Sequence, residues 1–404
     1  MKRLYLLDDA KAREFEPFAL TRPVSELRAG AEIIRLRWEL AAQAKAYGFI
    51  SAAHLRYFDE VDAPPSCHDE STIPAGSVIV NSRCVISLEA RLDDISAAFS
   101  CEGRICGVRI RKSMDAASLS DASISLDSLV EPGANVTALR GRWLDEVWDL
   151  IGDLGAQLAD DIPQIGGRLS GAAIENATII GKHPVYCETG VSIEPFVVFD
   201  ANDGPILIRR GATIASFSRI VGPCYIGKDS HVIGDAIRAC SIGDVCKVRG
   251  EISSTVMLGH SNKGHTGFVG SSYIGRWVNL GAGTTTSNLK NTYGNVQVWT
   301  PHGLRTTGLQ FLGSLIGDHA KTGIGSMLTT GCVIGAGANI YGSNASPKYV
   351  PPFAWGNSEP YDRFESEKFI EVAERMMARR HVTLNEKGRM HLAIACDTIG
   401  ASTK

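Results

Sequence analysis

The sequence lacks several features that would assign the protein to a broad class. It has no run of about 18 consecutive apolar residues, so no membrane-spanning helix is expected. Its 41 Lys and Arg against 44 Asp and Glu give a net charge of −3, without the basic excess of nucleic-acid-binding proteins. The opening run MKRLYLLDDAKAREFE turns acidic after an apolar stretch too short for a signal peptide. These absences predict a cytoplasmic protein that binds no nucleic acid and has no membrane span.

Paired cysteine motifs are also missing. The chain has ten cysteines, but none forms the C-x-x-C spacing that zinc ribbons and thioredoxin-like redox sites require. A long chain without an export signal is expected to keep its thiols reduced, and a free cysteine is usually buried. We therefore predict ten free, mostly buried cysteines.

Glycine is scarce in the first 150 residues and clusters between about 165 and 343. In that region aliphatic residues recur every six positions, and Gly follows many of them. A period of six fits neither an amphipathic helix nor simple strand alternation. It fits a triangular coil with three short faces, in which one aliphatic side chain per face points inward. The pattern predicts a left-handed parallel β-helix of hexapeptide repeats. Its clearest run is Ile208, Ile214, Ile220, Ile226 and Val232.

The 404 residues are enough for at least two domains, and the part before the repeats indicates a mixed α/β domain. We expect strands at Leu4–Asp9 and Ser77–Val80, and helices at Ala31–Gly48 and Ser87–Phe99. This order is consistent with a Rossmann-like fold of the nucleotidyltransferase type. The predicted boundaries are residues 1–139 for this domain, 140–166 for one linking helix, 167–350 for the β-helix and 351–404 for a C-terminal helical tail, with a helix at 366–380.

Two interruptions of the repeat are candidate functional loops, because an insertion must leave the coil. They are Met257–Gly275 and Ser287–Gly308. The stretch GHTGFVGSSYIGRWVNLGAGTTTSN, Gly264 to Asn288, resembles the acetyltransferase half of the bacterial N-acetylglucosamine-1-phosphate uridyltransferases, the GlmU family. The resemblance implies acetyl transfer from acetyl-CoA to an amino sugar phosphate, in a homotrimer with active sites between subunits.

Site residues follow from the same resemblance. His265 matches the family's catalytic histidine, whose imidazole removes a proton from the sugar 2-amino group before that nitrogen attacks the thioester. Asn279 and Asn288 match positions that hold the sugar and the histidine, while Ala282 and Ser314 match acetyl-CoA contacts.

The sequence departs from the family pattern at two points of this site. Phe268 stands at a substrate-binding position where the family has tyrosine, and so lacks the hydroxyl. The family's phosphate-binding Arg and Lys have no clear counterpart, for which Lys263 or Arg276 are the candidates.

Two alternatives remain open for this histidine. In the first alternative, His265 is an exposed loop residue that has no functional role. In the second, His260 and His265, spaced H-x4-H, bind zinc as in γ-class carbonic anhydrases, with a third ligand from His231 or Cys224.

The N-terminal stretch LYLLDDAKAREFEPFALTRPVSELRAG resembles a divergent GlmU-like nucleotidyltransferase. Compared with ordinary sugar nucleotidyltransferases it has Ala10 and Ala12 for glycines, Glu14 for an arginine and Val24 for a lysine, which makes a poorer cradle for a triphosphate. A further group of residues is implied if this domain transfers a nucleotide from UTP. Arg22, Arg28 and Asn81 would contact nucleotide or phosphate, and Asp8 or Asp9 would bind Mg2+.

In the alternative, Arg22, Glu26 and Arg28 form a structural ion-pair network. The N-terminal domain is then inactive, and the protein is a single-activity acyltransferase or a scaffold that binds nucleotide sugars. YVPPFAWGNSEPYDRF and EVAERMMARRHV extend the resemblance to this divergent family toward the C-terminus.

Overall fold

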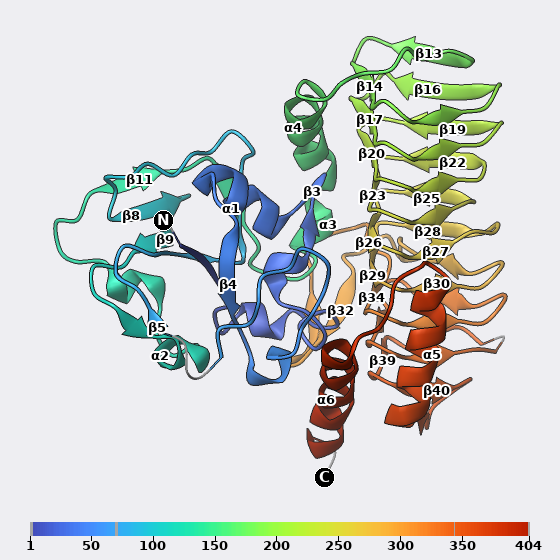
Figure 1. Ribbon diagram of the computed structural model, residues 1–404. Helices are drawn as coiled ribbons and strands as arrows, with labels where there is room; N and C mark the ends of the chain where they lie inside the picture. Colours follow the sequence, from blue (N-terminus) through green and yellow to red (C-terminus); the bar gives the residue numbers. More distant parts are fainter. Residues whose placement is uncertain (1–2, 69–71, 343, 403–404) are drawn as a thin grey trace. The chain divides into compact units, whose positions relative to one another are not determined.

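The computed structural model describes residues 3–68, 72–342 and 344–402 (Figure 1). The chain divides into two compact units. Unit 1 comprises the described residues of Met1–Val147 and Leu384–Lys404, and unit 2 comprises Trp148–Thr383. The expected organisation into an α/β domain, a β-helix and a C-terminal helix is confirmed. Each unit is described separately below.

Unit 1 is built on a six-stranded sheet with the strand order β11-β8-β9-β6-β1-β4. The central strand β1 is parallel to both β4 and β6, whereas β9 is antiparallel to its neighbours. These strands are rich in Val, Ile and Phe, and most of their side chains are buried. The bounds are β1 Leu4–Leu7, β4 Ala46–Ile50, β6 Val78–Asn81, β8 Ala98–Cys101, β9 Arg104–Arg109 and β11 Val136–Ala138, with helix α1 at Ile34–Ala42.

The predicted helix at Ser87–Phe99 is wrong. Its first residues form turns, and its last two begin strand β8. The Asp93 carboxylate accepts hydrogen bonds from the Ile95 and Ser96 amides and from the Ser96 hydroxyl, at 2.6 to 3.0 Å. Such local bonds offer the backbone an alternative to the helix.

The segment expected to form one helix at 140–166 contains a strand and two helices. Strand β12, Gly141–Trp143, pairs antiparallel with β7, Cys84–Ile86. A Cβ at Gly141 would lie 2.6 Å from the Val85 carbonyl oxygen, so glycine permits this close pairing. Helices α3, Asp149–Gly152, and α4, Leu154–Gly166, follow and are separated by Asp153 in a non-helical conformation. Trp148 begins unit 2, so the strand and the helices belong to different units.

Unit 2 is a parallel β-helix with three sheets of six, nine and ten strands, in which most strands pair with the strand one coil later. The residues of the six-residue period, from Ile208 to Val232, are almost fully buried and form its core. The predicted left-handed parallel β-helix is thus confirmed. Its first sheet contains β13 Ala177–Gly181, β16 Val197–Ala201, β19 Ser218–Val221, β22 Asp235–Arg238, β25 Glu251–Ser253 and β28 Phe268–Gly270.

The other two sheets complete each coil. The second contains β14 Val185–Cys187, β17 Ile206–Ile208, β20 Cys224–Ile226, β23 Ser241–Ile242, β26 Val256–Gly259, β29 Tyr273–Arg276, β34 Leu315–Ile316, β37 Val333–Ile334 and β39 Tyr349–Val350. The third contains β15 Ser192–Ile193, β18 Thr213–Ile214, β21 His231–Val232, β24 Lys247–Val248, β27 Asn262–Lys263, β30 Asn279–Leu280, β35 Lys321–Thr322, β38 Asn339–Ile340, β40 Ala354–Gly356 and β41 Asp362–Arg363.

The two expected interruptions differ in kind. Between β31, Thr285–Thr286, and β34 the chain leaves the coil as a hairpin of β32, Gln297–Thr300, and β33, Gly303–Thr306. Met257–Gly275, by contrast, stays largely within the coils and contributes residues to β26, β27, β28 and β29. Its corner at residues 264–267 carries the exposed side chains of His265 and Thr266.

Two helices follow the β-helix. Helix α5, Ser366–Ala378, begins where predicted and packs Phe369 against Phe353 at 5.0 Å between ring centroids. Helix α6, Glu386–Ser402, lies within the predicted helical tail, although its bounds were not predicted, and it belongs to unit 1. Its buried His391 lies 2.8 Å from the Thr21 carbonyl oxygen.

All ten cysteines are free and buried, as predicted. Among the described helices, none is long and apolar enough to cross a membrane.

Candidate functional site

The corner between β27 and β28 carries His265. Four residues, 264–267, connect these strands, whereas two residues, Arg249 and Gly250, make the same corner one coil earlier. The corner of the following coil, residues 281–284 between β30 and β31, also has four residues. The following coil fixes the loop, because the Gly283 amide donates to the Thr266 carbonyl oxygen at 3.1 Å.

Lys263 supports this loop from inside the coil. Its side chain is fully buried at an inward position that Val248 and Leu280 occupy in the neighbouring coils. The ammonium donates to the carbonyl oxygens of His265 and Thr266, the latter at 2.9 Å. Burial lowers the pKa of Lys263 from its ordinary value. Because the ammonium is enclosed by loop carbonyls, its placement does not agree with the predicted phosphate contact.

The His265 side chain is exposed at the tip of this corner. None of the described residues forms a hydrogen bond with its imidazole, which is therefore accessible to a substrate from solvent. The expected contact between the imidazole and Asn288 is not formed in this structure. Instead the Asn288 amide donates to the Ser271 hydroxyl at 3.3 Å.

Phe268 and Asn288 lie together above Gly270. A Cβ on Gly270 would be 2.4 Å from the Phe268 ring and 2.6 Å from the Asn288 amide nitrogen. Both side chains depend on the missing Cβ, since those distances are too short for real atoms. The structure thus brings two of the predicted substrate-binding residues to one position next to the His265 corner.

The remaining predicted residues of the β-helix are more dispersed. Asn279 follows Asn262 one coil later, and its side-chain oxygen accepts from the Asn262 amide at 3.2 Å. Ala282 is half-buried in the corner next to that of His265. Ser314 is fully buried, with its amide bonded to the Ser272 hydroxyl at 2.9 Å. This burial does not agree with a direct contact between Ser314 and acetyl-CoA.

The zinc alternative finds no geometric support. His260 and His265 lie beyond opposite ends of β27. His231 is hydrogen-bonded to the Thr213 hydroxyl at 2.8 Å, and Cys224 is buried in the β-helix core, where burial raises its pKa to about 12. Among the residues that the structure describes, no group of three or more His, Cys, Asp and Glu is arranged to hold a metal ion.

In unit 1, the predicted residues meet at the carboxyl ends of β1, β4 and β6, where open α/β sheets bind ligands. Asp8 follows β1 and is buried, and its Oδ2 accepts from the Ser51 hydroxyl at 2.6 Å and from the Val24 amide at 3.2 Å. Burial raises the Asp8 pKa to about 6. Asp8 therefore connects the PFALTRPVSELRAG stretch to the sheet edge.

Asp9 is bound by a neighbouring arginine. Arg83 contacts both Asp9 oxygens at 2.7 to 3.1 Å, and the Asn81 amide donates to Oδ2 at 2.8 Å. Burial opposes ionisation of Asp9, but the bonds and charge of Arg83 bring its pKa below the ordinary value. A guanidinium at this position repels a second cation. Asp8 and Asp9 therefore do not fit a resident Mg2+ in this arrangement. Arg83 was not among the predicted site residues, although it lies three residues after the predicted strand Ser77–Val80.

The two predicted phosphate-binding arginines are buried. Arg22 makes a bidentate pair with Glu60 at 2.8 and 3.2 Å, and Arg28 donates to the Ala31 carbonyl oxygen at 2.6 Å. Glu26 pairs with Arg35 at 2.5 Å. These contacts agree with the alternative in which this stretch carries structural ion pairs, although the pairing partners are Glu60 and Arg35.

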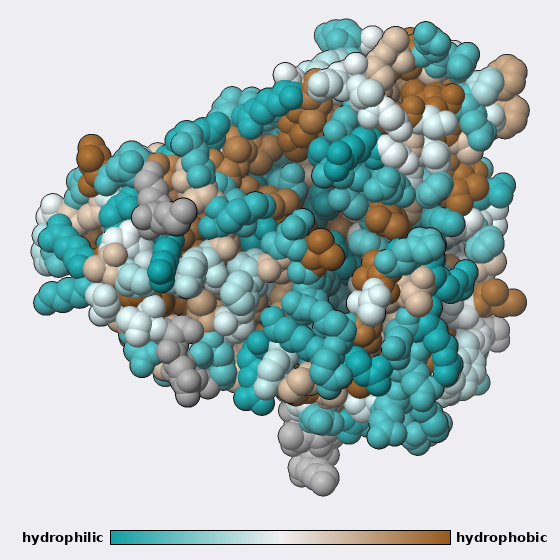
Figure 2. All heavy atoms as spheres, in the orientation of Figure 1, coloured by the Kyte–Doolittle hydropathy of each residue, from teal (hydrophilic) through white to brown (hydrophobic). Residues whose placement is uncertain are grey.

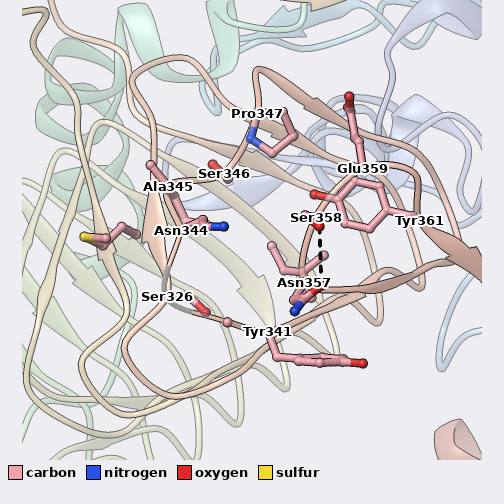
Figure 3. A pocket seen from close by; sticks show the side chains of 14 residues that line it. Ser326, Tyr341, Asn344, Ala345, Ser346, Pro347, Asn357, Ser358, Glu359 and Tyr361 are labelled. Atoms are coloured by element: carbon pink, nitrogen blue, oxygen red, sulfur yellow. Dashed lines mark hydrogen bonds between the residues drawn. The ribbon is translucent and has the colours of Figure 1, made fainter.

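A cavity of about 260 Å³ lies near the far end of the β-helix, lined by Tyr341, Asn357, Glu359 and Tyr361 among others (Figure 3). Asn357 and Ser358 are hydrogen-bonded in its wall at 3.4 Å. Its lining includes a glutamate but no lysine, arginine or histidine. An anionic sugar phosphate would therefore find no compensating charge there, and this cavity is not assigned to the site.

Comparison with known proteins gives one family match. Residues 4–168 match the sugar nucleotidyl transferase family. This range covers the sheet of unit 1 and continues through α3 and α4.

Individual relatives match parts of the chain. The bifunctional protein GlmU of Bartonella quintana is 29% identical over 192 residues, which cover 45% of this chain and 37% of the relative. A bifunctional sugar-1-phosphate nucleotidylyltransferase/acetyltransferase of Sulfurisphaera tokodaii is 37% identical over 91 residues, 22% of this chain and 23% of the relative. The chain thus spans well under half the length of these relatives.

Among solved structures, the UDP-N-acetylglucosamine acyltransferase LpxA of Bacteroides fragilis aligns over 57% of this chain and 97% of its own. The identity is 14% and the TM-score is 0.28.

Proposed function

For this GlmU-like chain, whose residues 4–168 match the sugar nucleotidyl transferase family, we propose that the β-helix unit N-acetylates an amino sugar 1-phosphate with acetyl-CoA. The observation that carries the proposal is the corner at 264–267. It exposes His265 on a loop held from inside by Lys263, next to Phe268 and Asn288.

The proposed reaction uses His265 as a general base. Its imidazole takes a proton from the 2-ammonium or 2-amino group of the sugar, whose nitrogen attacks the thioester carbonyl carbon. A C–N bond forms, the C–S bond breaks, and CoA leaves as a thiol after taking up a proton. Asn279 and Asn288 would orient the sugar, and the corner at Ala282 would lie along the acyl group.

The test is release of free thiol from acetyl-CoA in the presence of glucosamine 1-phosphate. Replacing His265→Ala should lower the rate at least a hundredfold, the typical contribution of general-base catalysis. His183→Ala removes another exposed histidine of the β-helix and should leave the rate unchanged. The proposal fails if wild-type protein releases no thiol with any of several amino sugar phosphates, or if His265→Ala retains the wild-type rate.

For unit 1 the family match supports a second activity, transfer of a uridylyl group from UTP to the acetylated sugar 1-phosphate. Mg2+ would arrive on the triphosphate as part of the substrate, because Asp9 is already paired with Arg83. Pyrophosphate release from UTP and N-acetylglucosamine 1-phosphate measures this activity. If the protein binds the nucleotide sugar without releasing pyrophosphate, unit 1 is a binding domain instead.

We further propose a cytoplasmic homotrimer. The free state of all ten thiols supports the location. Phe196 and Phe217 support the assembly, since they stack at 5.6 Å between centroids while remaining 72% and 77% exposed. Light scattering of the purified chain tests the trimer, and Phe217→Glu should shift it toward the monomer.

A further inference from the structure

A second cavity of about 260 Å³ lies in unit 2 between helix α5 and the third sheet of the β-helix. Figure 1 shows α5 lying along the coils that contain β30 and β40, and Figure 2 shows hydrophilic side chains over this helix. The lining residues are His260, Asn262, Asn279, Lys321, Val372, Arg375, Met376, Arg379 and Arg380.

The floor of this cavity is a ladder of polar side chains. Asn262, Asn279 and Lys321 line the cavity and are register partners on the successive parallel strands β27, β30 and β35. Lys247, on the preceding strand β24, continues the ladder outside the lining. Each rung lies about 4.8 Å from the next, and paired positions face the same side of the sheet. Asn279 is also one of the residues predicted to hold the sugar, so the cavity and the His265 corner share this part of the sheet.

The cavity contains uncompensated positive charge. Arg375 is paired with Glu371 at 2.8 Å. By contrast, no carboxylate of the described chain forms an ion pair with Lys321, Arg379 or Arg380. Lys321 donates to the His319 carbonyl oxygen at 2.9 Å, and Arg380 donates to the Asn262 side-chain oxygen. Two of these cations are thus held in place by neutral acceptors.

Burial and the neighbouring positive charges lower the pKa values of the cationic groups in and around the cavity. Burial lowers the pKa of Lys321 to about 8, and burial together with the charge of Arg379 lowers the pKa of Arg380. The pKa of His231, one rung before Lys247, is lowered by burial and by the charges of Lys247 and Arg380. A bound anion would relieve this repulsion.

We infer that this cavity binds the phosphate group of an organic phosphate, with Lys321, Arg379 and Arg380 as its cationic contacts. The inference rests on the proposed function, since the two substrates proposed there both carry phosphate. Guanidinium groups bind phosphate oxygens in a bidentate manner, and the partly buried ammonium of Lys321 adds a point charge.

The distance to the His265 corner suits such a substrate. Asn262 and His265 are three residues apart, and three residues span at most about 10 Å. An amino sugar 1-phosphate with its amino group at His265 could therefore extend toward this cavity. The phosphates of CoA offer the same chemistry from the other substrate.

Isothermal titration of the full-length protein tests the inference without catalysis. The probes are glucosamine 1-phosphate, glucosamine and CoA, each titrated into wild type, Arg379→Ala and Arg380→Ala. Lys368→Ala is the control, because it removes an exposed cation of α5 that does not line the cavity. Loss of one charged hydrogen bond should raise the Kd of the phosphate ligand about tenfold or more.

If the substitutions raise the Kd of glucosamine 1-phosphate alone, the cavity binds the phosphate of the sugar. If they raise the Kd of CoA alone, the cavity binds the phosphates of CoA. Equal Kd values in wild type and Arg379→Ala for both phosphate ligands overturn the inference, as does the absence of phosphate binding to wild type. Arg379 is exposed and its side chain forms no hydrogen bond or ion pair within the described chain, so its removal should leave folding intact even if Arg380→Ala unfolds. Phosphate binding without thiol release would refute the proposed acetyl transfer but not this site.

Discussion

The ammonium of Lys263 donates a hydrogen bond to the carbonyl oxygen of His265 from inside the β-helix. The lysine occupies a core position, and the histidine side chain lies outside on the same loop. An inward residue of the repeat thus determines the conformation of an outward one. Burial of a lysine costs free energy unless its ammonium donates hydrogen bonds, and the carbonyl oxygens of the loop at 264–267 accept them here.

The first prediction concerns Lys263→Met, which keeps the length of the buried stem but removes the donors. The carbonyls of His265 and Thr266 would lose a buried partner, at a cost of about 1–3 kcal/mol, and the loop should become mobile. We expect kcat for acetyl transfer to fall tenfold or more, and hydrogen–deuterium exchange to accelerate at residues 264–267. Leu280→Met, a volume-conserving change at the equivalent position of the next coil, should alter neither quantity. Normal exchange and kcat in Lys263→Met would refute the supporting role.

The second prediction concerns the sheet edge of unit 1. Arg83→Met leaves the largely buried Asp9 carboxylate without its cation and should destabilise unit 1 by about 3 kcal/mol. Arg111→Met removes an arginine of the same unit whose pair with Glu131 is exposed, and should cost less than about 1 kcal/mol. Hydrogen–deuterium exchange of the β1 amides reports the opening free energy of unit 1. Similar values for the two variants would contradict the structural importance of the Arg83–Asp9 pair.

The third prediction uses the raised pKa of Asp8, about 6 in the folded protein against an ordinary value of 3.8. A carboxyl group whose folded pKa is raised contributes stability that is complete below about pH 3.8 and is lost as pH rises through about 6. Asp8→Asn does not titrate, so its stability relative to wild type should increase by up to about 3 kcal/mol between pH 4 and pH 7. Hydrogen–deuterium exchange of the β1 and β4 amides at several pH values measures this difference in stability between the variant and wild type. A pH-independent difference would show that Asp8 is not the titrating group.

Much of the fold could be predicted because the β-helix requires an inward aliphatic residue every six positions. This period differs from those of an amphipathic helix and of an alternating strand. Each of Ile208, Ile214 and Ile220 is an inward residue of one face, and each is fully buried. The helix at Ser87–Phe99 failed because apolar spacing does not reveal that the Asp93 side chain would bind the backbone of Ile95 and Ser96. The bounds of helix α6 were not predicted because its packing in unit 1 depends on residues more than 300 positions away.

The candidate site was predictable in part. The motif located the His265 corner and its neighbours Phe268 and Asn288, since all three lie within 24 residues of one another. It could not show the direction of Lys263, because that depends on whether the position is inward in its coil. Charge pairing across unit 1 was equally hidden. Arg22 forms an ion pair with Glu60, and Asp9 forms one with Arg83. Both partners are distant in sequence from the N-terminal stretch that they bind.

The last prediction concerns His391 of α6, which packs edge-on against Phe58 at 5.6 Å and donates a hydrogen bond from Nε2 to the Thr21 carbonyl oxygen. Burial lowers its pKa to about 4, against an ordinary value of 6.5. A base whose folded pKa is depressed contributes stability that is complete above about pH 6.5 and is lost as pH falls toward 4, because the unfolded chain takes up a proton first. This effect is opposite in sign to that of Asp8 over nearly the same pH range. The two contributions therefore offset each other in the pH dependence of wild-type stability, which reveals neither of them alone.

His391→Gln keeps a donor for the Thr21 carbonyl oxygen but cannot titrate. Relative to this variant, wild type should lose up to about 3 kcal/mol of unit 1 stability between pH 6.5 and pH 4. Exchange of the α6 and β1 amides provides the measurement, and His183→Gln, an exposed histidine of unit 2, is the control. If the difference between wild type and His391→Gln stays constant over this range, burial of a neutral His391 does not couple α6 to the pH-dependent stability of unit 1.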